Sequence, residues 1–446
     1  MAFVPNTDNE RKEMLRKIGV DSFEDLIKNI PSEVRLQKDL DMPPKLSEYE
    51  AVKKMQSMAG KNVTAHSHIC FLGGGAYDHF IPSIVGSVLE RPEFKTAYTP
   101  YQAEVSQGTL QAMYEFQSMI CDLTGMDVAN ASLYDGGSAL AEACLMAFTL
   151  KKKKRFLMAG SLNPHYKNVI ETVCQGRDLI FESFISEDGT ADLDALENAA
   201  GDDVAAVIVQ QPNPYGNIEQ TNEIGKIAHD NKALYIVSVD PVSLGILTPP
   251  GEYDADIVTG EGQGLGIPLS YGGPYLGIFA VKNKYVRKIP GRIAGITKDT
   301  NDKRGYVLTL QTREQQIKRE RATSNICTNQ GLFMLAATVY MSTMGKKGIK
   351  EVAEQSFQKA HYLAEKIKEI PGFKLMNDKP FFKEFLVVPP VPASEIIEKG
   401  NNEGFLPGID TSRFKECKSG LLIAVTEKRN KEEMDKYIEF LKNYSR

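Results

Sequence analysis

Four apolar runs indicate the fold class: VAAVIVQ at residues 204–210, LYIVSVD at 234–240, DIVTG at 256–260 and YLGIFAV at 275–281. Each run is short, apolar and rich in β-branched or aromatic side chains, which is typical of a buried strand. Helix-like segments such as IEQTNEIGKIAHD separate most of these runs. Strands that alternate with helices predict βαβ units, and hence a mainly parallel sheet with helices on both faces.

The alternation begins near residue 125, and the pattern changes after residue 330 to two amphipathic helices, short apolar runs, one strand and a last helix. Right-handed crossovers would bring the carboxyl ends of the parallel strands, and the loops that follow them, to one edge of the sheet. We therefore expect a charged helical arm at 1–62, a large α/β domain at 63–330 and a small α+β domain at 331–446.

The composition excludes several classes of protein. The 446 residues are 42% apolar and 25% charged, which is ordinary for a globular chain, and the net charge of −5 argues against nucleic-acid and polybasic membrane binding. No apolar run approaches the roughly 20 residues that span a bilayer, and the N-terminus has no apolar core of a signal peptide. The six cysteines are scattered without a CxxC pair, so we expect reduced thiols in a cytoplasmic protein.

The arm is expected to be helical but to lack a core. Ser22 can cap a helix with Asp25 three residues on, and LSEYEAVKKMQSMAG reads as a further helix that ends at Gly60. Because the arm contains few apolar residues, we expect it to pack on another surface.

Two acidic residues stand where an open α/β sheet binds ligands. The loop that begins at Asp135-Gly136-Gly137 opens a helix, so its N–H groups could hold a phosphate, although the Asp135 carboxylate would repel one placed directly over it. An ordinary helix N-cap explains the same residues. Asp240 ends an apolar strand and would face the ligand crevice, or serve only as a turn residue.

The segment from Thr259 to Pro274 contains six glycines, so we expect neither a regular helix nor a central strand there. Apolar strands flank it directly, which favours a close-packed functional loop or a subunit contact over a flexible linker. His66, His68 and Cys70 alternate like ligands on one face of a strand, but no carboxylate cluster or CxxC completes a metal site. We therefore expect no metal, and a structural role for these residues.

Four longer motifs resemble the glycine cleavage system P-protein, glycine dehydrogenase (decarboxylating). They are FLGGGAYDHFIP, YTPYQAEVSQGTLQAMYEFQSMICDLTGMDVANASLYD, GEGQGLGIPLSYGGPYLG and RATSNICTNQ. They occur in the family's order, and the resemblance covers essentially the whole chain. It is to the alpha chain, subunit 1, of the two-chain form.

The resemblance implies fold type I of the pyridoxal phosphate (PLP) enzymes, with a seven-stranded, mainly parallel sheet and a smaller C-terminal α+β domain. It also implies that glycine is decarboxylated with PLP as the electron sink, and that the aminomethyl group passes to the lipoyl arm of the H-protein. The implied partners are a second, beta subunit, the lipoylated H-protein and the other glycine cleavage proteins.

One position departs from the family. With the turn at 272–274 aligned, Gln263 stands where the family has its PLP lysine, and the chain has neither lysine nor arginine from Ala233 to Val281. The strand aspartate that would pair with the pyridine nitrogen, Asp240, lies in the same window. A glutamine amide cannot form an imine with an aldehyde. We therefore expect no catalytic residue here, and PLP on the partner subunit.

Such a subunit would complete the partner's site across the interface, because hydroxyl and amide donors can fix small anionic groups without adding net charge. The residues expected near PLP are Ser324, Asn325 and Thr328, and those expected near the substrate or interface are Tyr98, Tyr101 and Gln102. Ordinary turn residues would look the same in sequence. Two other functions stay open: a free-standing PLP-dependent lyase or aminotransferase, against which the missing lysine counts, and a non-enzymatic binding protein that reuses the fold.

Overall fold

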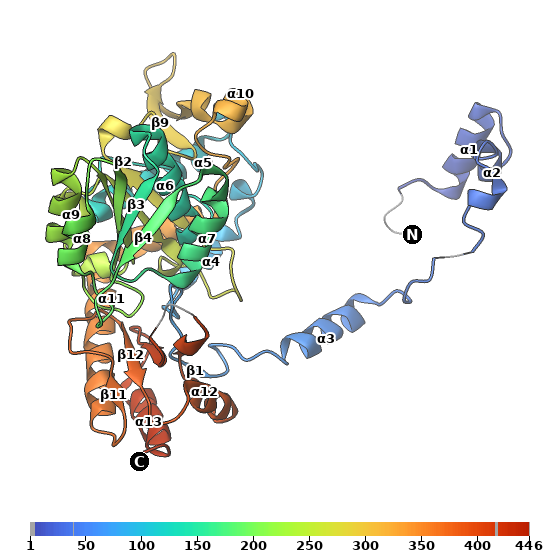
Figure 1. The fold of residues 1–446 in the computed structure, drawn as a ribbon. Coiled ribbons are helices and arrows are strands. Elements are labelled where there is room, and N and C mark those ends of the chain that lie inside the picture. The colour runs from blue at the N-terminus through green and yellow to red at the C-terminus, as the bar shows by residue number, and fades with distance from the viewer. Residues whose placement is uncertain (1–4, 39, 415–417, 446) are drawn as a thin grey trace. The chain divides into compact units, whose positions relative to one another are not determined.

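The computed structural model describes residues 5–38, 40–414 and 418–445, which form two compact units, Met1–Asn62 and Val63–Arg446. The first unit is helical, as predicted (Figure 1). Its α-helices are α1 (Asp8–Ile18), α2 (Phe23–Leu26) and α3 (Glu48–Ala59). Ser22 Oγ accepts a hydrogen bond from Asp25 N, and the Asp25 carboxylate accepts one from Ser22 N, which is the predicted capping box. None of these helices has a buried residue, so the described part of this unit has no core of its own.

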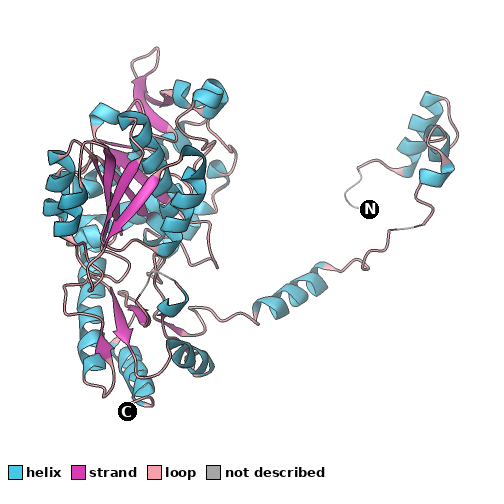
Figure 2. Cartoon of the chain, viewed as in Figure 1, coloured by secondary structure: helices cyan, strands magenta, loops and turns pink. Residues whose placement is uncertain are grey.

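The second unit is built on a seven-stranded sheet, which matches the expected α/β class (Figure 2). Its strands, in spatial order, are β2 (Val128–Ala129), β8 (Gly277–Val281), β7 (Ile257–Glu261), β6 (Leu234–Val239), β5 (Val204–Gln211), β3 (Arg155–Ala159) and β4 (Ile180–Phe184). Neighbours from β7 to β4 pair in parallel, and β8 and β2 pair antiparallel at the other edge. The sheet is therefore mainly parallel.

Helices cover both faces of this sheet because its strands are apolar on both sides. On β5, Val207 and Val209 belong to one hydrophobic core, whereas Ala206 and Ile208 belong to another. The helices in sequence order are α4 (Ser83–Leu89), α5 (Gln107–Thr124), α6 (Gly136–Lys151), α7 (Pro164–Cys174), α8 (Leu193–Ala199) and α9 (Thr221–Asp230). A hairpin of β9 (Ile293–Lys298) and β10 (Arg304–Thr309) and the short helix α10 (Gln315–Lys318) follow.

A separate core forms around the carboxyl-terminal elements. The four-stranded sheet has the order β11 (Lys374–Leu375), β12 (Glu384–Val388), β15 (Leu421–Ala424) and β14 (Ile409–Asp410). Its helices are α11 (Gly331–Lys368), α12 (Ala393–Asn402) and α13 (Lys431–Lys442). The range of α11 contains the two helices expected after residue 330, which meet at Gly345, whose φ of 60° is readily adopted by glycine. Strands β1 (Ile69–Cys70) and β13 (Phe405–Leu406) form a further parallel pair.

The strand predicted at 256–260 is present as β7, so the separate expectation that Thr259–Pro274 contains no central strand is wrong for its first three residues. Thr259 to Glu261 complete β7, which lies between β6 and β8 inside the sheet. A Cβ on Gly260 would lie 2.6 Å from the carbonyl oxygen of Val239, so glycine allows the neighbouring strand to approach at this point. From Gly262 to Ile267 the segment is buried but irregular, as expected of a close-packed loop.

No α-helix within the described residues is long and apolar enough to cross a membrane. Five of the cysteines are free thiols, and Cys417 lies outside the described residues. Among those described, no cluster of three or more His, Cys, Asp or Glu side chains could hold a metal ion. The ring of His68 instead contacts Ser67 Oγ and the carbonyl oxygen of Asn401, both at 2.9 Å.

Candidate active site

A narrow cleft opens at the carboxyl ends of β5, β6 and β7, where β12 of the four-stranded sheet meets the larger sheet. This is the edge at which an open α/β sheet is expected to bind ligands. The polar and charged side chains that line the cleft are Tyr77, Tyr166, Gln210, Asn213, Ser238, Asp240, Glu261, Lys383 and Glu384. Asp240 therefore faces the crevice, and its Oδ1 also accepts a turn hydrogen bond from Val242 N at 3.0 Å.

Lys383 brings a buried positive charge into the cleft from the residue immediately before β12. Its Nζ lies 2.7 Å from Asp240 Oδ2 and 2.9 Å from His79 Nε2, and it stands 3.7 Å from the ring centroid of Tyr77. The Lys383 side chain is 2% exposed. The ammonium group is therefore held by a carboxylate, an imidazole and an aromatic face at once.

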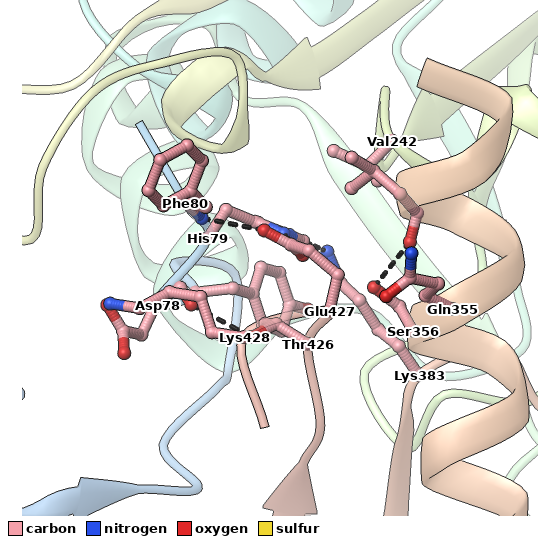
Figure 3. A network of polar contacts seen from close by, with 12 residues as sticks. Asp78, His79, Phe80, Val242, Gln355, Ser356, Lys383, Thr426, Glu427 and Lys428 are labelled. Atoms are coloured by element: carbon pink, nitrogen blue, oxygen red, sulfur yellow. Dashed lines mark hydrogen bonds and ion pairs between the residues drawn. The ribbon is translucent and has the colours of Figure 1, made fainter. Parts of the chain in front are cut away.

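His79 connects Lys383 to Glu427, and Figure 3 shows these side chains lying together. The His79 Nδ1 lies 2.6 Å from Glu427 Oε2, and Phe80 N donates to Glu427 Oε1 at 2.6 Å. An ammonium group can only donate, so His79 Nε2 accepts from Lys383 and Nδ1–H donates to Glu427. Burial opposes the charged form of Glu427, but the hydrogen bonds from the His79 ring and from the N–H of Phe80 favour the carboxylate, and the pKa of Glu427 is lowered.

Glu384, the first residue of β12, also lines the cleft. Its Oε1 accepts a hydrogen bond from Gly74 N at 2.6 Å, and its Oε2 accepts one from the hydroxyl group of Tyr77 at 2.9 Å. Burial raises the pKa of Glu384 to about 7, even though both hydrogen bonds favour the carboxylate. Tyr77 is thus fixed by Glu384 on one side and faces Lys383 with its ring.

Two carboxylates of the chain cover the N-terminus of α6. Asp135 is the N-cap residue, as the simpler sequence interpretation proposed, and its Oδ1 accepts from Ser138 N at 2.7 Å. Glu261 Oε2 accepts from Gly136 N at 2.9 Å, and its Oε1 accepts from Gln263 N and Leu276 N. Burial raises the pKa of Glu261, while its three N–H donors oppose that rise. The N–H groups of Gly136 and Ser138 at the start of this helix are therefore already occupied.

Gln263 is buried beside the cleft and fully engaged. Its Oε1 accepts from Tyr77 N at 2.8 Å, and its Nε2 donates to the carbonyl oxygens of Tyr77 at 3.0 Å and Ile267 at 2.7 Å. The side chain ties the segment around Tyr77 to the glycine-rich loop. Gln263 thus links these two segments through side-chain hydrogen bonds to their backbone.

A second polar region brings together two segments that the sequence singled out separately. Arg292 Nη1 donates to Thr328 Oγ1 at 2.6 Å, and Nη2 donates to the hydroxyl group of Tyr101 at 3.2 Å and to the carbonyl oxygen of Cys327 at 2.6 Å. Ser324 and Thr328 line a pocket here. Tyr101 and Thr328 therefore meet through Arg292, although they lie far apart in sequence.

The other predicted interface residues lie outside both pockets. Tyr98 is 87% exposed, and Gln102 and Asn325 are also exposed. Ser324 Oγ accepts a hydrogen bond from Ile326 N at 3.1 Å. Within the described residues, neither pocket is lined by these three exposed side chains.

Comparison with known proteins identifies the family. A model of the glycine cleavage system P-protein matches residues 1–441. The probable glycine dehydrogenase (decarboxylating) subunit 1 of Chloroherpeton thalassium is 53% identical over 442 residues, which covers 99% of each chain. The chain belongs to the glycine cleavage system P-protein family. A crystal structure of the glycine decarboxylase P-protein in inhibitor-bound form superposes on this member with a TM-score of 0.91 at 38% identity, over 100% of both chains.

The P-protein fold is shared with more distant PLP enzymes. The sphingosine-1-phosphate lyase of Burkholderia pseudomallei is only 13% identical, yet it matches with a TM-score of 0.66 over 93% of this chain and 94% of its own. The predicted fold type I architecture is therefore confirmed.

Sequence reasoning missed Lys383, Glu384 and Arg292. Each carried a signal, because Lys383 and Glu384 interrupt the apolar run FFKEFLVV, and Arg292 interrupts IPGRIAGI. Charged residues inside an apolar run are rarely buried unless they are paired or hydrogen-bonded. That signal marks such residues as candidates but does not name their partners.

Proposed function

We propose that this chain is subunit 1 of a two-chain glycine dehydrogenase (decarboxylating), and that it carries no PLP itself. The family match over residues 1–441 and the name of its relative support the first part. The second part depends on one observation, namely that side chains of this chain already pair with one another in the cleft. A cofactor site of this fold needs an amine, an acid for the pyridine nitrogen and free N–H groups for the phosphate.

The residues of this cleft do not fit PLP. Gln263 offers an amide, and all of its polar atoms are bonded to backbone groups. The amine that does enter the cleft, Lys383, forms an ion pair with Asp240, the acid expected to face the pyridine nitrogen. The side chains of Glu261 and Asp135 already accept hydrogen bonds from the N–H groups of Gly136 and Ser138 at the N-terminus of α6, so these two donors are not free for a phosphate. No step of the reaction is therefore assigned to this cleft.

The partner, a second P-protein subunit, would then hold PLP, which supplies the electron sink for glycine decarboxylation. In this proposal Tyr101, Ser324 and Thr328 face the partner's site, where their hydroxyl groups orient small anionic groups without adding charge. Tyr98, Gln102 and Asn325 complete the same surface, and their exposure is consistent with a role that a second chain completes.

The remaining parts of the proposal concern the domains of the chain, its partner proteins and its location in the cell. We assign residues 1–62 to an arm that packs on the partner, 63–330 to the large domain and 331–446 to the small domain. The lipoylated H-protein receives the aminomethyl group from the two-chain enzyme, together with the other glycine cleavage proteins, in the cytoplasm. The absence of any buried residue in the arm helices supports the role of the arm.

Two measurements test separately whether this chain binds PLP and whether its residues contribute to the partner's site. The purified chain, incubated with PLP, is expected to show no yellow Schiff-base absorbance and no glycine decarboxylation, whereas the two-chain complex shows both. In that complex, Tyr101→Phe and Ser324→Ala are expected to reduce glycine turnover or PLP affinity by roughly five- to a hundred-fold, with assembly intact. Decarboxylation by the single chain would refute the PLP-free subunit and favour a free-standing lyase.

A further inference from the structure

A strongly basic pocket lies away from the occupied cleft, between residues 287–292 and 313–328. Its five basic residues are Arg287, Lys288, Arg292, Arg313 and Lys318. Glu314 is its one acidic lining residue. In a chain whose net charge is −5, this local excess of positive charge is unusual.

Arg292 is the deepest of these cations, at 3% exposure. Its three hydrogen bonds all go to uncharged acceptors, namely the Thr328 and Tyr101 hydroxyl groups and the Cys327 carbonyl. Its Nε is buried and has no hydrogen-bond partner among the described residues. Burying a guanidinium without a counter-ion is costly, because the charge loses its hydration and gains no opposite charge in return.

Arg429 provides a comparison within the same chain. It is 5% exposed and also has a buried Nε without a partner. Its Nη2, however, lies 3.2 Å from Asp78 Oδ2, and its Nη1 lies 3.6 Å from Glu433 Oε1. The fold therefore neutralises Arg429 with carboxylates, whereas the described residues place no carboxylate within 4 Å of Arg292.

The other groups around the pocket leave the positive charge uncompensated. Arg313 donates from Nε to the carbonyl oxygen of Leu310 and from Nη2 to that of Gly291, both at 3.1 Å. Glu314 supplies one negative charge. Glu142 hydrogen-bonds Ser324, but burial raises the pKa of Glu142 to about 7, so it is partly uncharged at neutral pH.

We propose that this pocket binds a phosphate group, with Arg292 at its base. Guanidinium groups bind tetrahedral oxyanions through several N–H donors, and the hydroxyl groups of Thr323, Ser324 and Thr328 line the same pocket. The phosphate has two possible sources: free inorganic phosphate, or the phosphate ester of a cofactor held by a second subunit. The second source rests on the proposed function, whereas the first does not.

Inorganic phosphate tests the site in the purified full-length chain. Isothermal titration calorimetry and thermal unfolding are run against chloride at equal ionic strength, and phosphate is expected to bind and to raise the unfolding temperature. Arg292→Met should weaken phosphate binding at least tenfold. If Arg292→Met fails to fold, Lys318→Met replaces it in the test. This variant changes an exposed residue of the same pocket and should weaken phosphate binding several-fold. Lys346→Met, an exposed lysine elsewhere, is the control and should bind phosphate normally.

The two-chain complex separates the sources. If the phosphate belongs to the partner's cofactor, Arg292→Met should raise the Kd of the complex for PLP at least tenfold and leave that for pyridoxal, which lacks the phosphate, unchanged. If PLP affinity is unchanged while the single chain loses phosphate binding, the site takes free phosphate. Both results support the site. The proposed phosphate site is overturned if the wild-type chain responds to phosphate no more than to chloride. It is also overturned if folded variants at Arg292 and Lys318 bind phosphate like wild type. In either case, glycine decarboxylation by the two-chain complex would still support the proposed function.

Discussion

Replacing Lys383 with methionine should strongly destabilise the chain, because it breaks the buried ion pair that fills the cleft. Methionine keeps most of the apolar stem but removes the charge that Asp240 and His79 both contact, at 2.7 and 2.9 Å. Removing one partner of a buried pair costs about 3–5 kcal/mol. Since the Asp240 side chain is 16% exposed, water can partly rehydrate it, and we expect a loss of about 3 kcal/mol in the free energy of unfolding.

A double-mutant cycle isolates the pair itself. Asp240→Asn keeps a side-chain oxygen for the turn hydrogen bond to Val242 N, but it removes the carboxylate that forms the ion pair with Lys383. We expect this variant to lose about 2–3 kcal/mol, and the double variant to lose at least 1.5 kcal/mol less than the two single losses combined. The second substitution then removes a charge that the first has already left unpaired.

Urea unfolding followed by far-UV circular dichroism measures these free energies, since the chain contains no tryptophan to report by fluorescence. Lys379→Met is the matched control, because Lys379 forms a partly exposed pair with Asp188 at 3.1 Å and should cost no more than about 1 kcal/mol. Strictly additive effects, or a Lys383→Met loss no larger than that of the control, would refute the assignment of the pair as the element that fills the cleft.

Three further predictions concern titration, packing and assembly. Burial raises the folded-state pKa of Glu142 from 4.5 to about 7, so the stability tied to its neutral form is fully present below pH 4.5 and is lost as the pH rises through 7. Glu142→Gln should therefore flatten the fall in unfolding free energy between these pH values by up to about 3 kcal/mol, measured by urea unfolding at a series of pH values. Gly216→Ala would place a Cβ 1.7 Å from the carbonyl oxygen of Glu384 and should cost more than about 2 kcal/mol, whereas Gly272→Ala, which is also at positive φ but meets no atom within 4 Å, should cost clearly less. Equal losses in thermal unfolding would contradict this packing argument. Deleting residues 1–40 should weaken pairing with the second subunit, measured by analytical ultracentrifugation, while the unfolding midpoint of the remaining chain stays close to that of the full chain.

The seven-stranded sheet could be predicted because its information is local. The stretches 204–209 and 234–237 are apolar throughout, and this composition indicates that both faces of a strand are covered. The glycine-rich segment was harder to interpret. Glycine is unfavourable in a strand unless a neighbour must come close, and the approach of Val239 to Gly260 exists only once β6 and β7 pair.

The fold class, the family resemblance and the position of Gln263 in a window without lysine can all be predicted from the sequence, because each depends on residue type and order along the chain. The contents of the cleft become visible in the folded chain alone. Lys383 reaches Asp240 and His79 from remote parts of the sequence, and Arg292 joins Tyr101 to Thr328 in the same way. Such contacts have no periodicity, since they depend on where separate elements end in space. A buried charge in an apolar run therefore indicates that polar partners are needed. Only the folded chain shows what they are: Asp240 supplies a carboxylate to Lys383, whereas among the described residues Arg292 is hydrogen-bonded to uncharged groups alone.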